Sequence, residues 1–293
     1  MSQWSVKPRL AALAARLPSR PLTRFAPAPT GYLHLGHVVN ALYVWGLARA
    51  LDGRVLLRIE DHDRIRSRPE YARALLEDLA WLGFAPDAGT TTQSDDGQAY
   101  EQALDSLSRQ HHVYVCECSR KDGGGSRYTG RCRTRGLATG PGRGVRVELP
   151  PGVETFTDAV VGEQTQEPST QCGDLLVRDR DGQWTYQFAV AVDDHRQRVD
   201  LVIRGTDLLD STGRQVQLAR MLGRDRPAVF LHHPIVVKPS GEKLSKSSGD
   251  TGVRDLRDKG LSPAEVIGRA AAAAGLTTSA RPIDAPDIVE LFR

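Results

Sequence analysis

Two histidines three positions apart, in a turn rich in proline and glycine, are the first residues of this 293-residue chain whose types and spacing suggest chemistry. They are His34 and His37 of "PAPTGYLHLGH", residues 27–37. Between a strand and a helix, such a turn places backbone N–H groups and a helix N-terminus at the carboxyl edge of a parallel sheet, where nucleotides bind. Gly31 and Gly36 would let a flat ligand approach the backbone, and the imidazole N–H groups would donate to phosphate oxygens. Taken alone, the pattern is also typical of a capped turn with surface histidines.

A cluster of lysines forms the second candidate site. Only six of the 39 Lys and Arg residues are lysines, and three of these six lie in "KPSGEKLSKS", residues 238–247. A lysine ammonium is a compact charge on a flexible stem and can follow a migrating phosphate, whereas an arginine guanidinium is a rigid planar fork. Lys243 and Lys246 are therefore candidates for binding ATP phosphates, although such a pair by itself is also typical of a solvated turn.

The elements around these motifs alternate between strand and helix. "TRFAPAPTG" begins extended, residues 36–51 carry apolar side chains with helical spacing, and "GRVLLRIED" (53–61) indicates a buried strand. "RPEYARALLEDLAWLG" (68–83) indicates a helix that ends at Gly83. This succession predicts an α/β fold with a Rossmann-type parallel sheet covered by helices.

The second half of the chain carries weaker signals. We expect strands or strand-like segments in "DLLVRD" (174–179), "WTYQFAVAVDDH" (184–195) and "VDLVIRG" (199–205), and a helix over 211–223. A short helical carboxy-terminal part follows. Its helix over 262–275 has a capping signature, with Ser262 as the cap, Pro263 in the first helical position, Glu265 three residues after the cap and Gly275 as the stop.

Both motifs together resemble the two signature motifs of class I aminoacyl-tRNA synthetases, in the expected order. "RFAPAPTG", "RIEDHD", "YQFAVAVDDH" and "IRGTDLLDST" extend the resemblance to the glutamyl subgroup over residues 23–275. A full glutamyl-tRNA synthetase carries a large anticodon-binding part, but only 46 residues follow Ser247 here. The chain is therefore similar to the short glutamyl-Q tRNA(Asp) synthetase family. It keeps "HLGH" and "KLSKS" nearly as a full synthetase would, which is a departure from that family.

The resemblance implies a role for each matching residue. Glu60 would bind the α-ammonium of glutamate, and Tyr186 and Arg204 would help to hold its side-chain carboxylate. The rest of the implied glutamate pocket is Arg24, Phe25, Ala26, Pro27 and Ala28. The implied ATP-binding residues are His34, Gly36, His37 and Lys246, and the implied catalytic residues are His34, His37, Lys243 and Lys246. Asp193, Asp194 and His195 look like a metal cluster, but we interpret them as structural or cleft-lining.

Three of the four cysteines crowd into residues 116–132, within a Gly- and Arg-rich segment that has little hydrophobic periodicity. Thiolates at Cys116, Cys118 and Cys132 are suited to a structural zinc ion that holds together a segment without a core. The family that the chain resembles uses a tyrosine as the fourth ligand, which implies Tyr128. Other candidates for this ligand are His111, His112 and Cys172, and three free thiols are the alternative to a metal site.

These signals divide the chain into five parts. They are a basic amino-terminal extension (1–22), the first half of the catalytic domain (23–110), an inserted acceptor-binding zinc subdomain (111–173), the second half of the catalytic domain (174–250) and a helical carboxy-terminal segment (251–293). Residues 1–51 contain no Asp or Glu, which is typical of a transit peptide or of a segment that faces nucleic acid.

Composition limits the choice of partners only weakly. The net charge of +3 permits an anionic partner, and no apolar run approaches the roughly 20 residues of a membrane-spanning helix. The resemblance implies L-glutamate, ATP with Mg²⁺, and tRNA(Asp) bearing queuosine as partners of a cytoplasmic monomer. The alternatives are a truncated glutamyl-tRNA synthetase that charges the tRNA 3′ end, an adenylate-forming enzyme that uses no RNA, and a non-catalytic tRNA-binding module.

Overall fold

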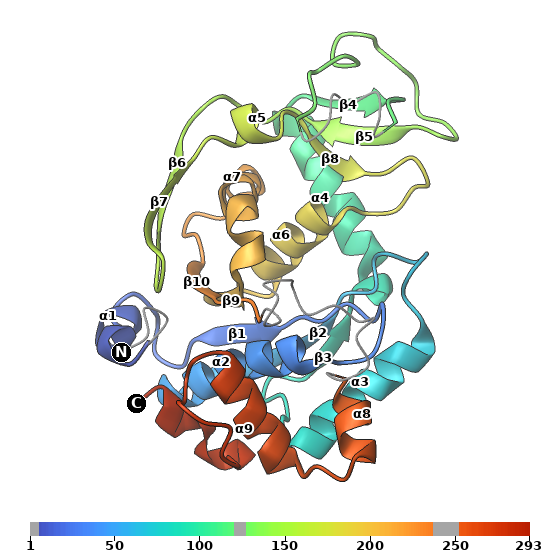
Figure 1. Ribbon diagram of the computed structural model, residues 1–293. Helices are drawn as coiled ribbons and strands as arrows, with labels where there is room; N and C mark the ends of the chain where they lie inside the picture. Colours follow the sequence, from blue (N-terminus) through green and yellow to red (C-terminus); the bar gives the residue numbers. More distant parts are fainter. Residues whose placement is uncertain (1–5, 120–126, 237–251) are drawn as a thin grey trace.

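The computed structural model describes residues 6–119, 127–236 and 252–293. Within these ranges, the largest sheet has five parallel strands in the order β10–β9–β1–β2–β3 (Figure 1). The strands are β1 (Leu22–Phe25), β2 (Arg54–Ile59), β3 (Thr90–Thr92), β9 (Leu201–Gly205) and β10 (Val229–His233). Apart from β3, the strands of this sheet are almost wholly buried. This burial is expected of a parallel sheet that is covered on both faces.

Helices cover both faces of this sheet (Figure 1). One face carries α2 (Leu35–Ala50), α3 (Pro69–Leu82), α8 (Val253–Asp258) and α9 (Pro263–Ala273), and the other carries α6 (Tyr186–Arg196) and α7 (Thr212–Met221). The central helix α2 also packs against η4 (Ala285–Leu291) near the end of the chain. A Cβ atom at Gly46 would lie 2.2 Å from the Phe292 ring, so this close contact depends on a glycine in α2.

The strand order creates a switch point at β1. The chain passes from β1 to β2 and β3 on one side, and later adds β9 and β10 on the other side. The segments that leave the carboxyl ends of β1 and β9 therefore diverge and open a crevice. Ligands of open α/β sheets bind in such crevices, so the residues that follow β1, β9 and β10 are the first place to look for a site.

The described residues between 113 and 178 form a part of the molecule that we call the insert, whose sheet lies at the top of Figure 1 and whose hairpin runs down one side toward the large sheet. In its described part, β4 (Val113–Cys116), β5 (Gly144–Val147) and β8 (Leu175–Arg178) form an antiparallel sheet. A hairpin of β6 (Glu154–Asp158) and β7 (Gly162–Gln166) and the short helix α5 (Pro168–Gln171) complete it. The hairpin reaches the large sheet, where the Ala159 N–H donates to the Phe230 carbonyl at 2.9 Å.

The remaining elements are short or connect these layers. They are η1 (Lys7–Arg9), α1 (Leu10–Ala14), η2 (Gln93–Asp96), α4 (Gly97–Gln110) and η3 (Thr206–Ser211). The described part of the predicted amino-terminal extension is packed, since Val6 and Leu13 are both buried in the core. Leu22, which the prediction placed in the extension, is the first residue of β1. None of the described helices combines the length and apolar character that crossing a membrane would require.

Most of the predicted elements are confirmed, and one is wrong. The Ser262 hydroxyl accepts from the Glu265 N–H at 3.3 Å and the Glu265 carboxylate accepts from the Ser262 N–H at 2.8 Å, as the capping signature predicts. By contrast, "WTYQFAVAVDDH" contains helix α6 rather than a strand. Residues 188–194 are buried on every side of this helix, so the apolar pattern has no helical periodicity and its alternating valines imitate a strand.

Candidate active site

A cavity of about 300 Å³ lies at the switch point, at the carboxyl ends of β1, β9 and β10. Most of the residues singled out from the sequence line it: Arg24, Phe25, Ala26, Pro27, His34, Gly36, His37, Glu60, Tyr186 and Arg204. Ala28 does not line it, and Lys243 and Lys246 lie outside the described residues. The fold therefore brings residues from three distant segments of the chain into one cavity.

His34 and His37 hold each other in place at the start of α2. The His34 N–H donates to Nδ1 of His37 at 3.1 Å, and Nδ1 of His34 accepts from the Gly36 N–H at 3.1 Å. Two imidazoles thus form the capping box that Ser or Thr and Glu usually form. From the sequence, a capped turn and a catalytic pair were alternatives. In the structure, the same two side chains both cap the helix and line the cavity.

This capping fixes which ring nitrogen carries the proton. Each Nδ1 accepts a hydrogen bond from the backbone, so the neutral ring carries its proton on Nε2. Both histidines are thereby Nε2–H donors beside a helix N-terminus, a combination that binds anions. A Cβ atom at Gly36 would lie 2.9 Å from the His34 ring, so this glycine makes room for an imidazole.

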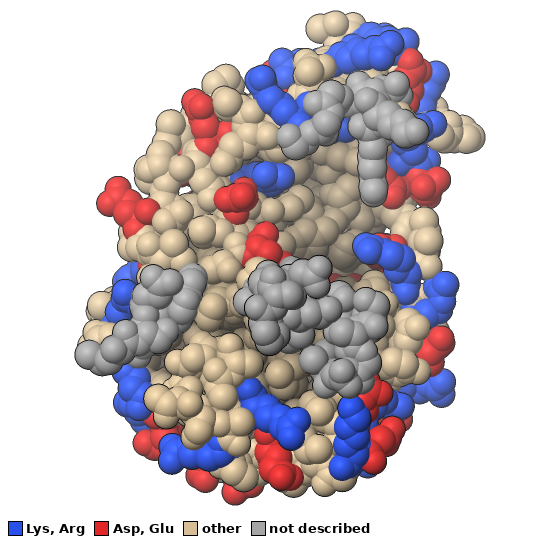
Figure 2. Space-filling model, viewed as in Figure 1, with Lys and Arg blue, Asp and Glu red and all other residues tan. Residues whose placement is uncertain are grey.

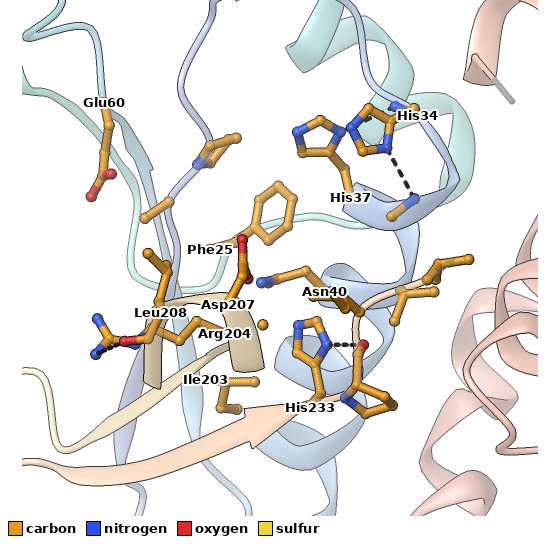
Figure 3. A pocket seen from close by; sticks show the side chains of 18 of the residues that line it. Phe25, His34, His37, Asn40, Glu60, Ile203, Arg204, Asp207, Leu208 and His233 are labelled. Atoms are coloured by element: carbon orange, nitrogen blue, oxygen red, sulfur yellow. Dashed lines mark hydrogen bonds between the residues drawn. The ribbon is translucent and has the colours of Figure 1, made fainter. Parts of the chain in front are cut away.

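The cavity has two chemically different ends. Figure 3 shows His34 and His37 at one end, and Glu60 and the Arg204 side chain toward the other. Donors for an anionic group thus face a carboxylate and a guanidinium across the cavity. A ligand that fits this arrangement carries both an anionic group and an ammonium group.

Glu60 follows β2 and is held from one side only. Arg58 donates to Oε1 of Glu60 from Nε (3.2 Å) and from Nη2 (3.0 Å). In the described part of the chain, no group donates to the other carboxylate oxygen, Oε2. The buried Glu60 can therefore accept from a ligand ammonium without giving up its bonds to Arg58.

Arg204 is a buried guanidinium surrounded by neutral acceptors. It donates to Nε2 of His232 (3.0 Å), Oε1 of Gln215 (2.6 Å) and Oγ1 of Thr212 (2.8 Å). It forms no ion pair with a carboxylate of residues 6–119, 127–236 or 252–293. Burial lowers the pKa of Arg204, because removal from water disfavours the charged form of the guanidinium. A buried cation of this kind is suited to a carboxylate ligand.

A second group of charges lies behind the cavity. Asp194 accepts from Nε of Arg24 (3.1 Å) and from Nη1 of Arg58 (2.8 Å). Burial by itself would raise the pKa of Asp194, but these two guanidinium groups outweigh it and lower the pKa. Asp193 accepts from Nε2 of Gln93 (2.7 Å) and from the Tyr100 hydroxyl (2.9 Å). These carboxylates form ion pairs and hydrogen bonds of the protein itself, so their role in the described structure is structural.

Residues 22–281 match the family model described as tRNA synthetases class I (E and Q), catalytic domain. The chain belongs to this family. The glutamyl-Q tRNA(Asp) synthetase of Burkholderia cenocepacia is 43% identical over 279 residues, which cover 90% of this chain and 91% of that protein. The glutamate–tRNA ligase of Oleidesulfovibrio alaskensis is 40% identical over 261 residues, but the chain spans only 56% of its length.

A solved structure agrees with the family. The crystal structure of a glutamate tRNA ligase from Elizabethkingia meningosepticum, in complex with its amino acid, matches with a TM-score of 0.77 and 26% identity. The match covers 94% of this chain and 65% of that one. The predicted membership of the class I synthetases and the predicted α/β fold are confirmed.

Several residues of the site were not predicted from the sequence. Asp207 and His233 line the cavity, and Arg58 and His232 hold cavity residues from behind. Asp207 lies in "IRGTDLLDST" and Arg58 lies in "RIEDHD", so the family segments contained both. The signal at Arg58 was a charged residue inside an apolar strand, which is rarely buried without a partner.

The cysteine cluster lies in the insert, remote from the cavity in sequence. Among the described residues, Cys116, Cys118 and Cys132 are the group whose ligand atoms, all within 4.8 Å of one another, could hold a metal ion. Tetrahedral zinc with Zn–S bonds of about 2.3 Å requires sulfur atoms about 3.8 Å apart, so the cluster is compatible with zinc. Three thiolates would leave such a site with a net negative charge, and Arg135 and Arg146 donate to Sγ of Cys132 and Cys116.

Tyr128 is the candidate fourth ligand that lies in the cluster. Its hydroxyl accepts from the Cys132 N–H at 2.9 Å and lies 3.4 Å from Sγ of Cys116. The alternatives lie elsewhere, since Cys172 donates to the Pro168 carbonyl at 3.2 Å and His112 pairs with Glu148 at 3.0 Å. A Cβ atom at position 173 would lie 1.9 Å from the Tyr128 carbonyl, so Gly173, at a φ of +68°, lets the Tyr128 segment approach.

Proposed function

We propose that this chain activates L-glutamate with ATP and transfers it to the queuosine base in the anticodon loop of tRNA(Asp). The observation that carries the activation step is the two-ended cavity. A buried guanidinium without a carboxylate partner in the described structure lies at one end, and two imidazole donors at a helix N-terminus lie at the other. Membership of the class I synthetase family supports the proposal.

The end with Arg204 and Glu60 fits glutamate. Arg204 would bind the side-chain carboxylate together with Tyr186, while Glu60 would bind the α-ammonium. Glutamine in the same position would present an amide to the buried guanidinium and leave its charge unpaired, which is costly. Arg24 to Pro27 also line this cavity. With its side chain and its ammonium held in this way, glutamate would present its α-carboxylate to the histidines.

The end with His34 and His37 fits the phosphates of ATP. An α-carboxylate oxygen of glutamate attacks the α-phosphorus, the bond to the bridging oxygen breaks, and pyrophosphate leaves with Mg²⁺, which yields a mixed anhydride. The Nε2–H groups would stabilise the charge that develops on the phosphate oxygens, so catalysis rests on positioning and electrostatics.

Lys243 and Lys246 complete this end in the proposal. The segment 237–251 lies outside the described residues, but both of its flanks are at the cavity. Val236 lines the cavity, and Gly252 forms a β-bridge with His34. The described residues on both sides of this segment are thus at the cavity, which supports a role for the two lysines in binding ATP phosphates.

A second cavity would receive the acceptor nucleotide. It has a volume of about 370 Å³ and is lined by His62, Tyr100 and Trp184, among others. The His62 ring lies 6.1 Å from the ring of Tyr186, which lines the first cavity, so the two cavities adjoin. A hydroxyl of the queuosine cis-diol attacks the acyl carbon of the mixed anhydride, loses its proton to solvent, and AMP leaves. Figure 2 shows Lys and Arg side chains gathered over the insert, above the hollow between the layers, where they would contact RNA phosphates.

Zinc would hold the insert together. We propose one structural zinc ion bound by Cys116, Cys118, Tyr128 and Cys132, because their ligand atoms already meet. In the insert, Cys116, Tyr128 and Cys132 form a small buried cluster with Tyr114, and Cys118 and Leu137 pack against it. The ion would supply the binding energy that so small a core lacks.

The test is acylation of tRNA with radiolabelled glutamate, followed by mapping of the label. We expect glutamate-dependent ATP–pyrophosphate exchange without RNA, and label in the anticodon loop of tRNA(Asp) that contains queuosine. The second candidate function is charging of the tRNA 3′ end, which the 40% identity to a glutamate–tRNA ligase favours. Label at the 3′ end that periodate treatment of the tRNA prevents, or equal labelling of tRNA without queuosine, would show that function instead.

A further inference from the structure

A buried chain of three side chains ends at Arg204. Nδ1 of His232 lies 2.7 Å from Oδ2 of Asp158, and Nε2 of His232 lies 3.0 Å from Nε of Arg204. Asp158 is 2% exposed, His232 is 0% exposed and Arg204 is 3% exposed. Asp158 and His232 were not singled out from the sequence, and both come from elements that lie behind the cavity, β6 and β10.

The hydrogen bonds of this chain have one consistent direction. A carboxylate only accepts, so Nδ1 of His232 carries the proton and donates to Asp158. Nε2 of the same ring then has a lone pair, and it accepts from the Nε–H of Arg204. Asp158 is itself fixed, because its Oδ1 accepts from the N–H groups of Val160 (2.9 Å) and Val161 (2.8 Å) in the turn of the hairpin.

We propose that His232 is a positioning residue that holds the Arg204 guanidinium in the orientation that receives the side-chain carboxylate of the substrate, and that Asp158 fixes the tautomer on which this depends. The proposal rests on the proposed function, in which Arg204 binds that carboxylate. His232 accepts from Nε of Arg204, so this side of the guanidinium is fixed. The Nη groups are then oriented by Gln215, by Thr212 and by the bound ligand. The insert, which contains Asp158, thereby contributes to the choice of amino acid.

The charges around His232 make this arrangement sensitive to acid. Arg204 and Arg24 face it from β9 and β1, His233 adjoins it on β10, and Asp158 faces it from the hairpin. Burial lowers the pKa of His232 and the two arginines lower it further, against the opposing effect of Asp158. Neutral His232 accepts from Arg204, but a protonated ring would turn an N–H toward the N–H of Arg204. The guanidinium would then be displaced, and the affinity for glutamate would fall.

Three variants separate positioning from a merely structural role. In His232→Asn, the side-chain amide can still donate to Asp158 but cannot reach Arg204. In His232→Gln, the longer amide can place its oxygen where Nε2 lies and accept from Arg204. Thr212→Val is the matched control, since it also removes an acceptor of Arg204 but no titratable group. The hydroxyl that it removes lies 3.3 Å from Nε2 of His232 as well.

The measurement is glutamate-dependent ATP–pyrophosphate exchange between pH 5 and 8, with KM and kcat for glutamate and KM for ATP. For His232→Asn we expect a KM for glutamate raised about 10- to 100-fold, the scale for one lost hydrogen bond to a charged group, with kcat and the KM for ATP within about threefold. His232→Gln should recover most of this loss. The wild type and Thr212→Val should show a KM for glutamate that rises in acid, and His232→Asn should not.

Two outcomes would overturn the inference. One is a His232→Asn variant with the KM and pH profile of the wild type, and the other is a loss of kcat together with a higher KM for both substrates. If His232→Asn does not fold, the comparison of His232→Gln with Thr212→Val decides, because only the histidine variant should lose the rise in acid. A wild type that shows no glutamate-dependent exchange contradicts the proposed function and is recognised by that assay alone.

Discussion

His34 and His37 combine an observed structural role, the capping of α2, with the chemical role that we propose for them. Each Nδ1 is used to cap α2, and each Nε2–H is directed by that cap. The helix begins where the imidazoles lie, so the same hydrogen bonds that stabilise the element orient the donors. A substitution that keeps the cap but removes the imidazole should therefore separate the two roles.

His37→Gln is such a substitution. Glutamine is a favoured residue at this position of a capping box and can accept from the His34 N–H, so we expect the unfolding temperature to change little. The rate of ATP–pyrophosphate exchange should fall about 10- to 1,000-fold, the scale for losing one preorganised donor. His37→Ala, which removes both roles, should lose the same activity and also about 1 kcal/mol of stability. Full exchange activity in His37→Gln would contradict this role for the imidazole.

At the scale of elements, α3 and α8 meet through a buried carboxylate. Neither oxygen of Asp78 has a hydrogen-bond partner among the described residues, and Nε of Arg254 lies 3.6 Å from Oδ1. Burial raises the pKa of Asp78 to about 6, although Arg254 and Arg257 oppose the change. A carboxyl whose pKa is higher in the folded state contributes stability that is present below its unfolded pKa and is lost as pH rises through about 6.

Asp78→Asn should remove this dependence. We expect the unfolding temperature of the wild type to fall as the pH rises from 4 to 7. At pH 8 the variant should be more stable than the wild type by about 1–3 kcal/mol. Thermal unfolding at each pH measures both. Asp255→Asn on α8 serves as the control, and a variant that is less stable than the wild type at pH 8 would show that Asp78 is held by its ion pair instead.

In our proposal, the acceptor nucleotide binds in the second cavity, which is lined by α4 and by the loop that contains Trp184. Trp184 lies 5.8 Å from the Tyr100 ring and 5.2 Å from the Phe188 ring, and Arg178 packs over it at 4.9 Å. Such a platform is suited to stacking of an extruded base, which contributes about 1–3 kcal/mol.

Trp184→Ala should therefore lower kcat/KM for transfer to tRNA about 10-fold or more. The ATP–pyrophosphate exchange should stay within about threefold of the wild type, since Trp184 does not line the first cavity, and Trp184→Phe should recover part of the transfer. Equal losses in both reactions would place Trp184 in the support of the first cavity and not in the binding of the acceptor.

At the scale of the whole molecule, the cysteine cluster forms a small core of its own, whereas β5 and β8 of the insert share a core with α4, α6 and α7. The β6–β7 hairpin connects the insert to the large sheet through Asp158, while the cysteine cluster holds the far side of the insert. Loss of the cluster should thus disturb the insert first and the activation site only secondarily.

Elemental analysis of protein purified without chelators should find about one zinc per chain. Cys118→Ser should lose the metal and lower the stability of the insert, which limited proteolysis would show, while glutamate activation remains largely intact. Cys172→Ser is the matched control, because Cys172 bonds to backbone carbonyls outside the cluster. Protein without metal, or equal loss of exchange and insert stability in Cys118→Ser, would contradict a purely structural ion.

The sequence by itself determined what depends on near neighbours. Histidines three apart at a helix start and a Ser–Pro–x–Glu cap act within one or two turns of chain, and the clustered cysteines lie within 17 residues of one another, so these features could be predicted from short stretches of the sequence. The tertiary structure decided the rest. Residues 188–194 are buried on all sides of their helix. Their apolar residues therefore show no helical periodicity from which the helix could be predicted. Asp158 reaches His232 across 74 positions, and Arg204 becomes a candidate binding group because of the neutral acceptors that folding places around it. Which buried charged groups contact one another depends on how the whole chain packs, so the partners of Asp158 and Arg204 could not be predicted from the sequence.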